Sequence, residues 1–211
     1  MTKAKAKAET KTKTKTKKPA AKAELATLTF ATPAALDAWL AKHHASSPGV
    51  WIQLAKKATG VASVTYPECV ELALVYGWID GQKRPLDEAA WLQKLTPRGA
   101  RSIWSKINRD KALALIASGK MHAAGRAQVE RAQADGRWDD AYDSPRTAEV
   151  PADLAKALAA TPGAKAAFAA LDGRNRYAVL WRVQTAKRPE TRARRIADLV
   201  ALLARGEKLH P

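Results

Sequence analysis

The first 24 residues constrain the fold most, because they cannot contribute to a hydrophobic core. They carry nine lysines and two glutamates, and threonine and lysine alternate through residues 10–17. A strand with this alternation would place like charges on one face and nothing large and apolar on the other. Since no burial offsets the entropy cost of ordering such a segment, we predict a disordered tail over residues 1–24 and a folded unit that begins at Leu25.

The net charge indicates that the chain interacts with anionic partners. It is +17 overall, and residues 25–211 contribute +10 of this, with 28 basic against 18 acidic side chains. Such an excess of positive charge favours nucleic acid, acidic lipids or phosphorylated ligands as partners. Alternatively, it only keeps the protein soluble, and no polyanion binds. Lysine-rich repeats bind nucleic acid without sequence preference, so the tail is either a nucleic-acid contact or a solubilising extension. The candidate nucleic-acid contacts of the tail are Lys11, Lys13, Lys15, Lys17 and Lys18.

Several features predict a cytoplasmic protein. Cys69 is the only cysteine, so no intramolecular disulfide can form, which suits a reducing compartment. The basic N-terminus is not followed by the apolar segment of a secretory signal. The longest apolar stretches, residues 69–79 and 196–204, contain Glu71 and Asp198 and are too short to span a bilayer. We therefore expect no membrane-spanning segment.

Hydrophobic periodicity predicts an α+β lobe over residues 25–140. Apolar residues alternate with other side chains in residues 50–54, which indicates a strand, and they recur at helical spacing after a Thr32–Pro33 start signal. Thr65 and Glu68 form a capping box that starts a second helix. We expect strands at 28–30, 50–54, 78–79 and 90–95, a turn-rich segment at 80–87, and helices after residues 32 and 65 and at 106–118 and 123–134.

The second half of the chain is predicted to be helical. A linker at residues 141–150, with many turn-forming residues, separates the first lobe from a helical lobe at residues 151–211. Apolar residues recur there at helical spacing in four segments, and Pro189 begins the last. Arg192 falls on the apolar stripe of this last helix, so we expect it to be partly buried and paired with an acidic side chain. The predicted fold class is α+β: a small antiparallel or mixed sheet with helices, followed by an all-helical C-terminal lobe.

Four short segments, in order along the chain, carry a family resemblance. They contain the patterns GWIDG and TPRxxRSxWS in the first lobe, then a glycine-containing region that ends in DGRW, and then an arginine-rich helix start. The segments are residues 73–82, residues 96–108, residues 119–121 with Gly125 and residues 135–138, and residues 190–196. In these segments the chain resembles the YdeI/OmpD-associated family, also called bacteriocin-protection or OmdA-type proteins. The resemblance implies a link to envelope stress and to resistance against cationic peptides, and it implies no particular reaction.

Residues 96–111 form the strongest candidate for a ligand site. Pro97 and Gly99 indicate a loop, and Ser105 can cap the helix that follows. Free N–H groups at a helix start, serine hydroxyls and arginine forks are the components of an anion site, and Trp104 offers a stacking surface. The same residues also suit a structural role, with the arginines paired to acidic side chains and Trp104 in the core. The candidate ligand-binding residues of this segment are Arg98, Arg101, Ser102, Trp104, Ser105 and Asn108.

The segment that follows the second helix supplies further candidates. Asp80–Gly81 is typical of a turn, in which the carboxylate bonds to its own backbone. Alternatively, Trp78, Asp80 and Gln82 form an enzyme pocket with the two arginines, in which Asp80 positions a ligand or acts as a base. A closed pocket that contains Asp80 would favour the enzyme, and an exposed turn would argue against it.

No cofactor or metal site is expected. His43 and His44 are adjacent and diverge by about 100° on a helix, so they cannot share a metal ion. Cys69 lies on the apolar side of its helix, where a core role fits better than a nucleophile. The chain has no glycine-rich nucleotide-binding motif and no serine-hydrolase motif. The hypotheses that remain are a cytoplasmic protein that binds an anionic ligand, an enzyme of unassigned reaction, and a nucleic-acid-binding protein that acts through its tail.

Overall fold

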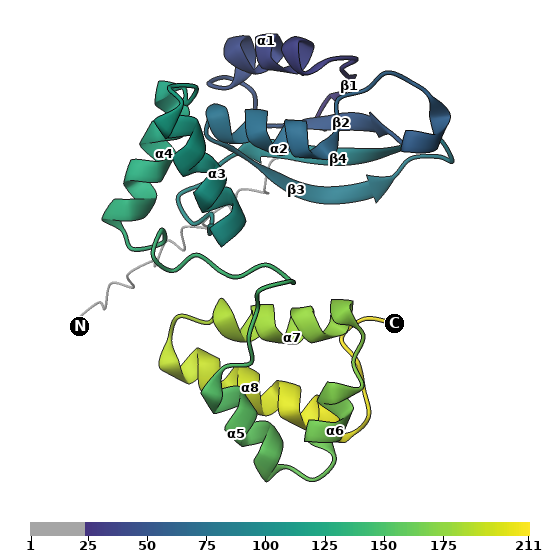
Figure 1. The fold of residues 1–211 in the computed structure, drawn as a ribbon, viewed down its shortest axis with the longest axis vertical. Helices are drawn as coiled ribbons and strands as arrows, with labels where there is room; N and C mark the ends of the chain where they lie inside the picture. The colour runs from purple at the N-terminus through teal and green to yellow at the C-terminus, as the bar shows by residue number, and fades with distance from the viewer. Residues whose placement is uncertain (1–23) are drawn as a thin grey trace, which may run out of the picture.

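One mixed sheet of four strands organises the first lobe of the chain (Figure 1). The computed structural model describes residues 24–211, so the predicted tail and its five candidate lysines lie outside the described residues, apart from Glu24. The strands are β1 (Thr27–Thr29), β2 (Val50–Ala55), β3 (Trp78–Pro85) and β4 (Ala90–Pro97), in the order β1-β2-β4-β3. β1 is parallel to β2 and the other neighbours are antiparallel, which confirms the predicted mixed sheet.

Three helices of this lobe start where their capping residues predict. The lobe contains α1 (Pro33–His43), the short 3-10 helix η1 (Lys57–Thr59), α2 (Tyr66–Val75), α3 (Lys106–Ala117) and α4 (Ala123–Ala134). Thr32 caps α1, and Thr65 forms the expected capping box with Glu68 at the start of α2. The Ser105 hydroxyl accepts from the backbone N–H of Asn108 at 3.1 Å and so caps α3.

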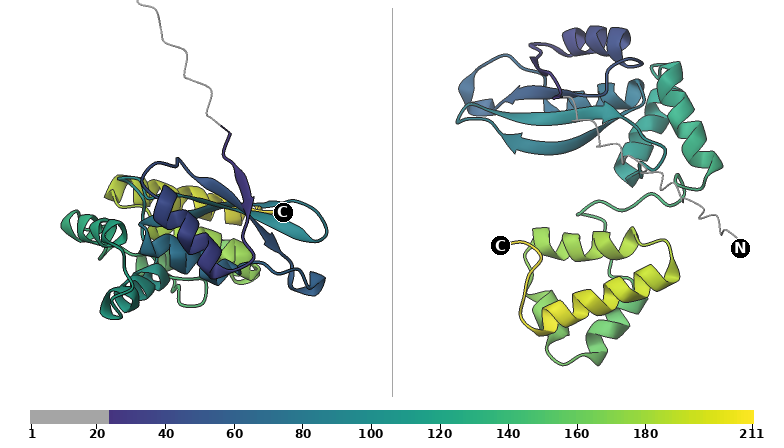
Figure 2. Two further views of the ribbon diagram at one scale, coloured as in Figure 1. Left: turned by 90° about the horizontal axis from the view of Figure 1, so that it is seen from above. Right: turned by 180° about the vertical axis from the view of Figure 1, so that it is seen from behind.

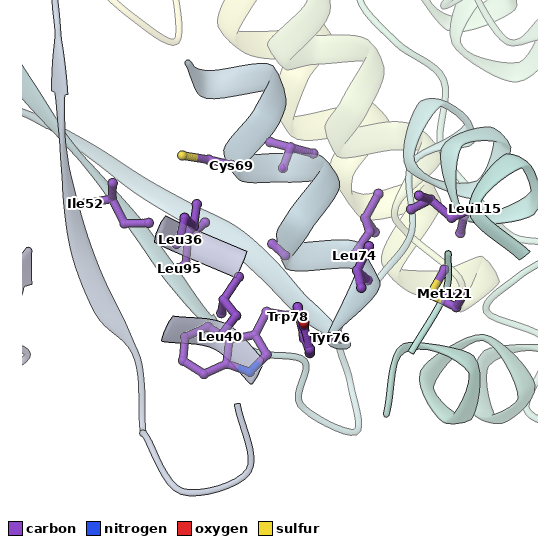
Figure 3. Packing of buried hydrophobic residues seen from close by; sticks show 14 of the residues in the cluster. Leu36, Leu40, Ile52, Cys69, Leu74, Tyr76, Trp78, Leu95, Leu115 and Met121 are labelled. Carbon is purple, nitrogen blue, oxygen red and sulfur yellow. The ribbon is translucent and has the colours of Figure 1, made fainter. Parts of the chain in front are cut away.

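The core of the first lobe lies between the sheet and its helices. α2 lies in front of the strands and α1 above them in Figure 1. Figure 3 shows the Trp78 indole beside Leu40 within this core. Trp78 is 1% exposed, and its Nε1–H donates to the His44 carbonyl at 3.1 Å. Cys69 is buried on the inner side of α2, as predicted. Both residues therefore serve packing.

The turn predicted for residues 80–87 is wrong for most of its length. β3 continues through Pro85, and the chain reverses only at residues 86–89. A β-bulge between Asp80 and Lys83 shifts the register of the pairing with β4. The residues that suggested a turn thus accommodate an extra residue within a strand. Because Asp80 pairs with buried Leu95, it lies on the face of the sheet that α2 covers.

A second hydrophobic core forms in the C-terminal part of the chain. The helices α5 (Ala152–Ala160), α6 (Ala164–Ala169), α7 (Gly173–Gln184) and α8 (Pro189–Ala204) surround it, which confirms the predicted all-helical lobe (Figure 1). Leu154, Phe168, Val179 and Leu203 are among its buried side chains. Within residues 24–211, every helix is too short or too polar to cross a bilayer.

The segment between the two cores contacts both of them. Tyr142 pairs with Ser105 in an isolated β-bridge, and the Tyr142 carbonyl accepts from the Lys106 N–H at 2.9 Å. The Asp143 carboxylate forms an ion pair with Lys106 at 2.6 Å and accepts from Gln184 Nε2 at 3.0 Å. Residues 142 and 143 are therefore fixed to the start of α3 on one side and to α7 on the other.

The pairing expected for Arg192 is present in the helical lobe. Its guanidinium donates to both carboxylate oxygens of Asp153, at 2.6 and 2.9 Å, and to the Val183 carbonyl at 2.8 Å. These hydrogen bonds from Arg192 lower the pKa of the Asp153 carboxyl. The ion pair ties α8 to α5, while the bond to Val183 ties it to α7.

Replacing Asp153 with asparagine should weaken the helical lobe and remove part of its acid sensitivity. The pKa of Asp153 is lower in the folded than in the unfolded chain, so the ion pair contributes fully above about pH 5 and this contribution is lost as the pH falls through the lowered pKa. For a partly exposed pair we expect a loss of about 1 kcal/mol at pH 7. Urea denaturation of both proteins at pH 7, 4 and 3 measures the difference in the free energy of unfolding. An equal difference at every pH would contradict a contribution from the ion pair.

Candidate functional site

A cavity of about 330 Å³ opens where α2, β3, α3 and the segment after α4 meet. α2 contributes its first turns, β3 contributes Asp80 at the bulge, and α3 contributes its N-terminal half. This volume is at the lower end of the range for small-molecule sites. The residues that line the cavity are Tyr66, Pro67, Val70, Asp80, Ser105, Ile107, Asn108, Lys111, Tyr142, Ser144 and Pro145.

Arg98 does not line the cavity itself, and much of its hydrogen-bonding capacity is unused. Its backbone N–H donates to the Gly77 carbonyl at 3.0 Å, which fixes the residue beside the start of β3. The residue is 5% exposed, and Nη1 donates to the Ile103 carbonyl at 3.3 Å. Nε and Nη2 are buried without a hydrogen-bond partner among the described residues. Buried donors without partners are rare in native proteins, where a bound water, ion or ligand usually satisfies such groups.

Aromatic packing and electrostatics hold the Arg98 guanidinium in place. Its Cζ lies 3.6 Å from the centre of the Trp104 ring, which packs edge-on against Trp138. Burial lowers the pKa of Arg98 to about 10, and the charges of Asp80 and Tyr142 partly oppose that shift. These two cavity-lining groups are therefore close enough to act on the guanidinium. A bound anion would act in the same sense as Asp80, because negative charge stabilises the cationic form.

The N-terminus of α3 adds positive potential to the same cavity. Ser105 and Ile107 line it at the first turn of this helix, and Lys111 lines it one turn further along. The N–H groups of a first turn and the helix dipole favour a negative charge at that end. Arg98, Lys111 and the start of α3 thus provide three sources of positive potential around one cavity.

Asp80 gives the cavity a contrasting acidic group. The Tyr66 hydroxyl donates to Asp80 Oδ2 at 2.6 Å. Burial raises the pKa of Tyr66, and the hydrogen bond to Asp80 raises it further, so the phenol stays protonated at neutral pH. Burial likewise raises the pKa of Tyr142, and the charge of Asp80 adds to this effect. The cavity therefore combines a cationic side with a carboxylate that already accepts one hydroxyl.

This arrangement suits a small organic anion better than a metal ion. Charged guanidinium and ammonium groups match a carboxylate or a phosphate, while Pro67, Val70 and Ile107 offer apolar contact to a short carbon chain. In residues 24–211, no group of three or more His, Cys, Asp or Glu side chains is placed to hold a metal ion. The His44 ring instead bonds through Nδ1 to the Leu40 carbonyl at 3.0 Å.

The structure brings together part of the predicted ligand site. Asp80, Ser105 and Asn108 line the cavity, and Arg98 packs against Trp104 outside the lining. Neither Arg98 nor Arg101 forms the salt bridge considered for it with a carboxylate in the described part of the chain. Trp104 is buried, as in the core role considered for it, and its ring packs against the Arg98 guanidinium.

Besides Arg98 and Trp104, four of the predicted residues lie outside the cavity lining. Trp78 belongs to the core, and the Ser102 hydroxyl accepts from the Gly99 N–H at 3.0 Å within a turn. Arg101 is exposed and does not line the cavity. Gln82 lines a different hollow, together with Trp51. The β-bulge explains this last separation, because it turns Asp80 and Gln82 to opposite faces of the sheet.

Eight residues that line the cavity are not among the predicted site residues, and Tyr66, Tyr142 and Ser144 are three of them. Tyr66 follows the Thr65 cap directly, so its place at a helix start was visible, but its contact with Asp80 depends on the pairing of β3. Tyr142 and Ser144 lie in the segment predicted to be a linker, where no periodicity assigns side chains to a face. Only their contacts with the start of α3 reveal them as part of the site.

Two family models match separate parts of the chain. One, described as a domain of unknown function, matches residues 28–128, which include the sheet and most of the cavity. The other, described as "Bacteriocin-protection, YdeI or OmpD-Associated", matches residues 147–206, and it confirms the family resemblance over α5 to α8. The segments at residues 73–82 and 96–108, which also carry the resemblance, lie in the part matched by the first model. No curated protein and no solved structure matches the chain.

Proposed function

Given that the chain carries a YdeI/OmpD-associated domain in residues 147–206, we propose that it is a binding protein whose other lobe takes up a small organic anion beside Arg98. The observation that carries this proposal is the buried Arg98 guanidinium, whose Nε and Nη2 have no partner among the described residues. An anion that reaches these two donors gains charge-assisted hydrogen bonds in a site with little competing water.

The chemistry of the cavity narrows the ligand to a small carboxylate or phosphate monoester. A volume of about 330 Å³ admits a short carbon chain and excludes an extended polymer. Lys111 and the α3 start attract the anionic end, and Asp80 with Tyr66 can bond a hydroxyl or amino group further along the ligand. The ligand that fits all three features is a small acid with a second polar group.

The family description supports a setting for this binding function. A YdeI/OmpD-associated domain is described as one of bacteriocin protection, so we propose that ligand binding contributes to the response to envelope stress or cationic peptides. We also propose a cytoplasmic location, because the single cysteine is a buried free thiol that suits a reducing compartment.

Matched pairs of charged and neutral ligands test the proposal. Butyrate and butyramide have nearly the same shape and differ in charge, and orthophosphate tests the anion alone. We expect isothermal titration calorimetry to detect butyrate and orthophosphate, and to show butyramide bound at least about tenfold more weakly. Arg98→Met should weaken butyrate binding about 100-fold, because two charge-assisted hydrogen bonds are lost.

Arg101→Met provides the control for that experiment. It removes an arginine three residues away whose side chain is exposed, unlike the buried Arg98, so it should leave butyrate affinity unchanged. Equal binding of butyrate and butyramide, or equal effects of the two arginine substitutions, would contradict an anion site at Arg98.

A second candidate function, an enzyme of unassigned reaction, is favoured by one observation. Asp80 lies in β3 and lines the cavity instead of occupying an exposed turn. With Tyr66 donating to it, Asp80 is placed to accept a proton or orient a polar group of the ligand. Asp80→Asn should then abolish turnover of a bound acid while changing its affinity only a few fold. If a bound acid is recovered chemically unchanged after incubation with the wild-type protein, the enzyme hypothesis is wrong and binding remains the proposed function.

A further inference from the structure

The sheet face that points away from α2 carries a second hollow, separate from the cavity beside Arg98. Seen from behind, the strands lie in front of the helix that covers their other face (Figure 2, right). The hollow has a volume of about 540 Å³. All four strands and two of the described residues before β1 contribute side chains to it. On this face Trp51 pairs with Lys94, and Arg84 pairs with Leu92.

Two cations flank the Trp51 indole in this hollow. Arg84 Cζ lies 4.4 Å from the centre of the ring, and Lys94 Nζ lies 5.8 Å from it. Trp51 is only 7% exposed, whereas Arg84 is exposed. A guanidinium held over an indole keeps its outer side in solvent, where a second flat group can stack on it. In residues 24–211 neither cation forms an ion pair with a carboxylate, so both charges are available to phosphate.

The basic N-terminal segment joins the folded chain at this same hollow. Glu24 lines its edge, and β1 begins three residues later at Thr27. Residues 1–23, which lead into Glu24, contain nine lysines and one glutamate. A polyanion on this face would therefore lie next to the point at which a strongly basic segment starts. Two adjacent basic elements of one chain favour an extended polyanion over a small ion.

We propose that this face of the sheet binds single-stranded nucleic acid. Stacking on the Arg84–Trp51 pair requires an unpaired base, because a base within a duplex is covered on both sides by its neighbours. Lys94 then contacts a phosphate, and the exposed Gln82 amide can bond to a base edge. Binding is tolerant of sequence, since every base has a π face. The site is separate from the anion cavity, so either can fail without the other.

Fluorescence anisotropy of labelled 20-mers of oligo(dT) and oligo(U) with the full chain tests this proposal, with a 20-base-pair duplex for comparison. Arg84→Gln should weaken binding of the single strands about tenfold and binding of the duplex much less. Lys83→Gln is the matched control. Lys83 is the preceding residue of β3 and lies 4.2 Å from the Trp91 ring, but it pairs with buried Gln93 on the other face. Its loss should leave the affinity nearly unchanged.

Salt titrations separate stacking from charge. Arg84→Lys keeps the charge and loses the flat guanidinium, so affinity should fall while the salt slope stays the same, whereas Arg84→Gln should lower the slope by about 0.7. Glutamine at all five candidate tail lysines should lower the slope by up to about 3.5 and preserve the effect of Arg84→Gln. Equal losses for Arg84→Gln and Lys83→Gln, or full affinity in Arg84→Lys, would overturn the proposal. Unchanged melting temperatures serve as the folding control.

Discussion

Replacing Gly125 with alanine should lower the free energy of unfolding by about 3 kcal/mol and the melting temperature by about 10 °C. Gly125 lies within α4, where this helix passes the C-terminal end of α2. A Cβ at this position would meet two backbone carbonyl oxygens, that of Leu74 at 2.6 Å and that of Val75. Backbone atoms of a helix cannot rotate aside as a flexible side chain can, so the two helices would have to separate.

Gly173→Ala is the control for that prediction. Gly173 is the first residue of α7, and a Cβ there would have no other atom within 4 Å. This substitution should keep or slightly raise stability, because alanine reduces the conformational entropy of the unfolded chain. Thermal unfolding of both variants measures the difference, and equal stability would contradict the close approach of α4 to α2.

Arg98→Met should weaken anion binding about 100-fold and still leave the free energy of unfolding unchanged or raised by up to about 2 kcal/mol. Methionine keeps an apolar contact with Trp104 and removes two buried donors that have no partner among the described residues. Loss of the cation–π contact with Trp104 offsets part of this gain. Weaker anion binding together with unchanged or higher stability is the result expected if Arg98 serves binding and not folding.

Arg137→Met shows what a structural arginine in the same region should do. The Arg137 guanidinium pairs with Asp135 at 2.7 Å and donates to the Ser102 carbonyl at 2.6 Å. Its removal should lower the free energy of unfolding by about 1 kcal/mol in urea denaturation, because satisfied bonds are lost. A loss of more than about 2 kcal/mol in Arg98→Met would instead assign a structural role to Arg98 as well.

The sequence allowed prediction of those features that depend on neighbouring residues. The caps at Thr32, Thr65 and Ser105 were read from three- or four-residue patterns, and each starts a helix in the structure. The pairing of Arg192 with an acidic group followed from a charge on an apolar stripe, where an unpaired cation would be costly. Local patterns of this kind determine where helices and strands begin and end, but they do not determine how these elements pack against one another.

The site could be predicted only in part because its geometry depends on long-range pairing. Asp80 and Gln82 are two residues apart and would share a face in a regular strand, but the bulge sends them to different hollows. Arg98 and Arg101 carry the same charge in the same segment, and only contacts with Gly77 and Trp104 bury the first of them. Tyr142 joins the site through a bridge to Ser105, 37 residues earlier. Nothing in the sequence near these residues encodes such contacts.

The most direct test of the anion site is the Nε–H signal of Arg98 in a ¹H–¹⁵N spectrum of the full chain during titration with butyrate. The signal is assigned by its absence from the spectrum of Arg98→Met. An anion that binds at this guanidinium should shift the signal saturably, with the exposed Arg101 unaffected over the same concentrations. An Arg98 signal that stays in place while those of exposed arginines move would contradict an anion site in this cavity.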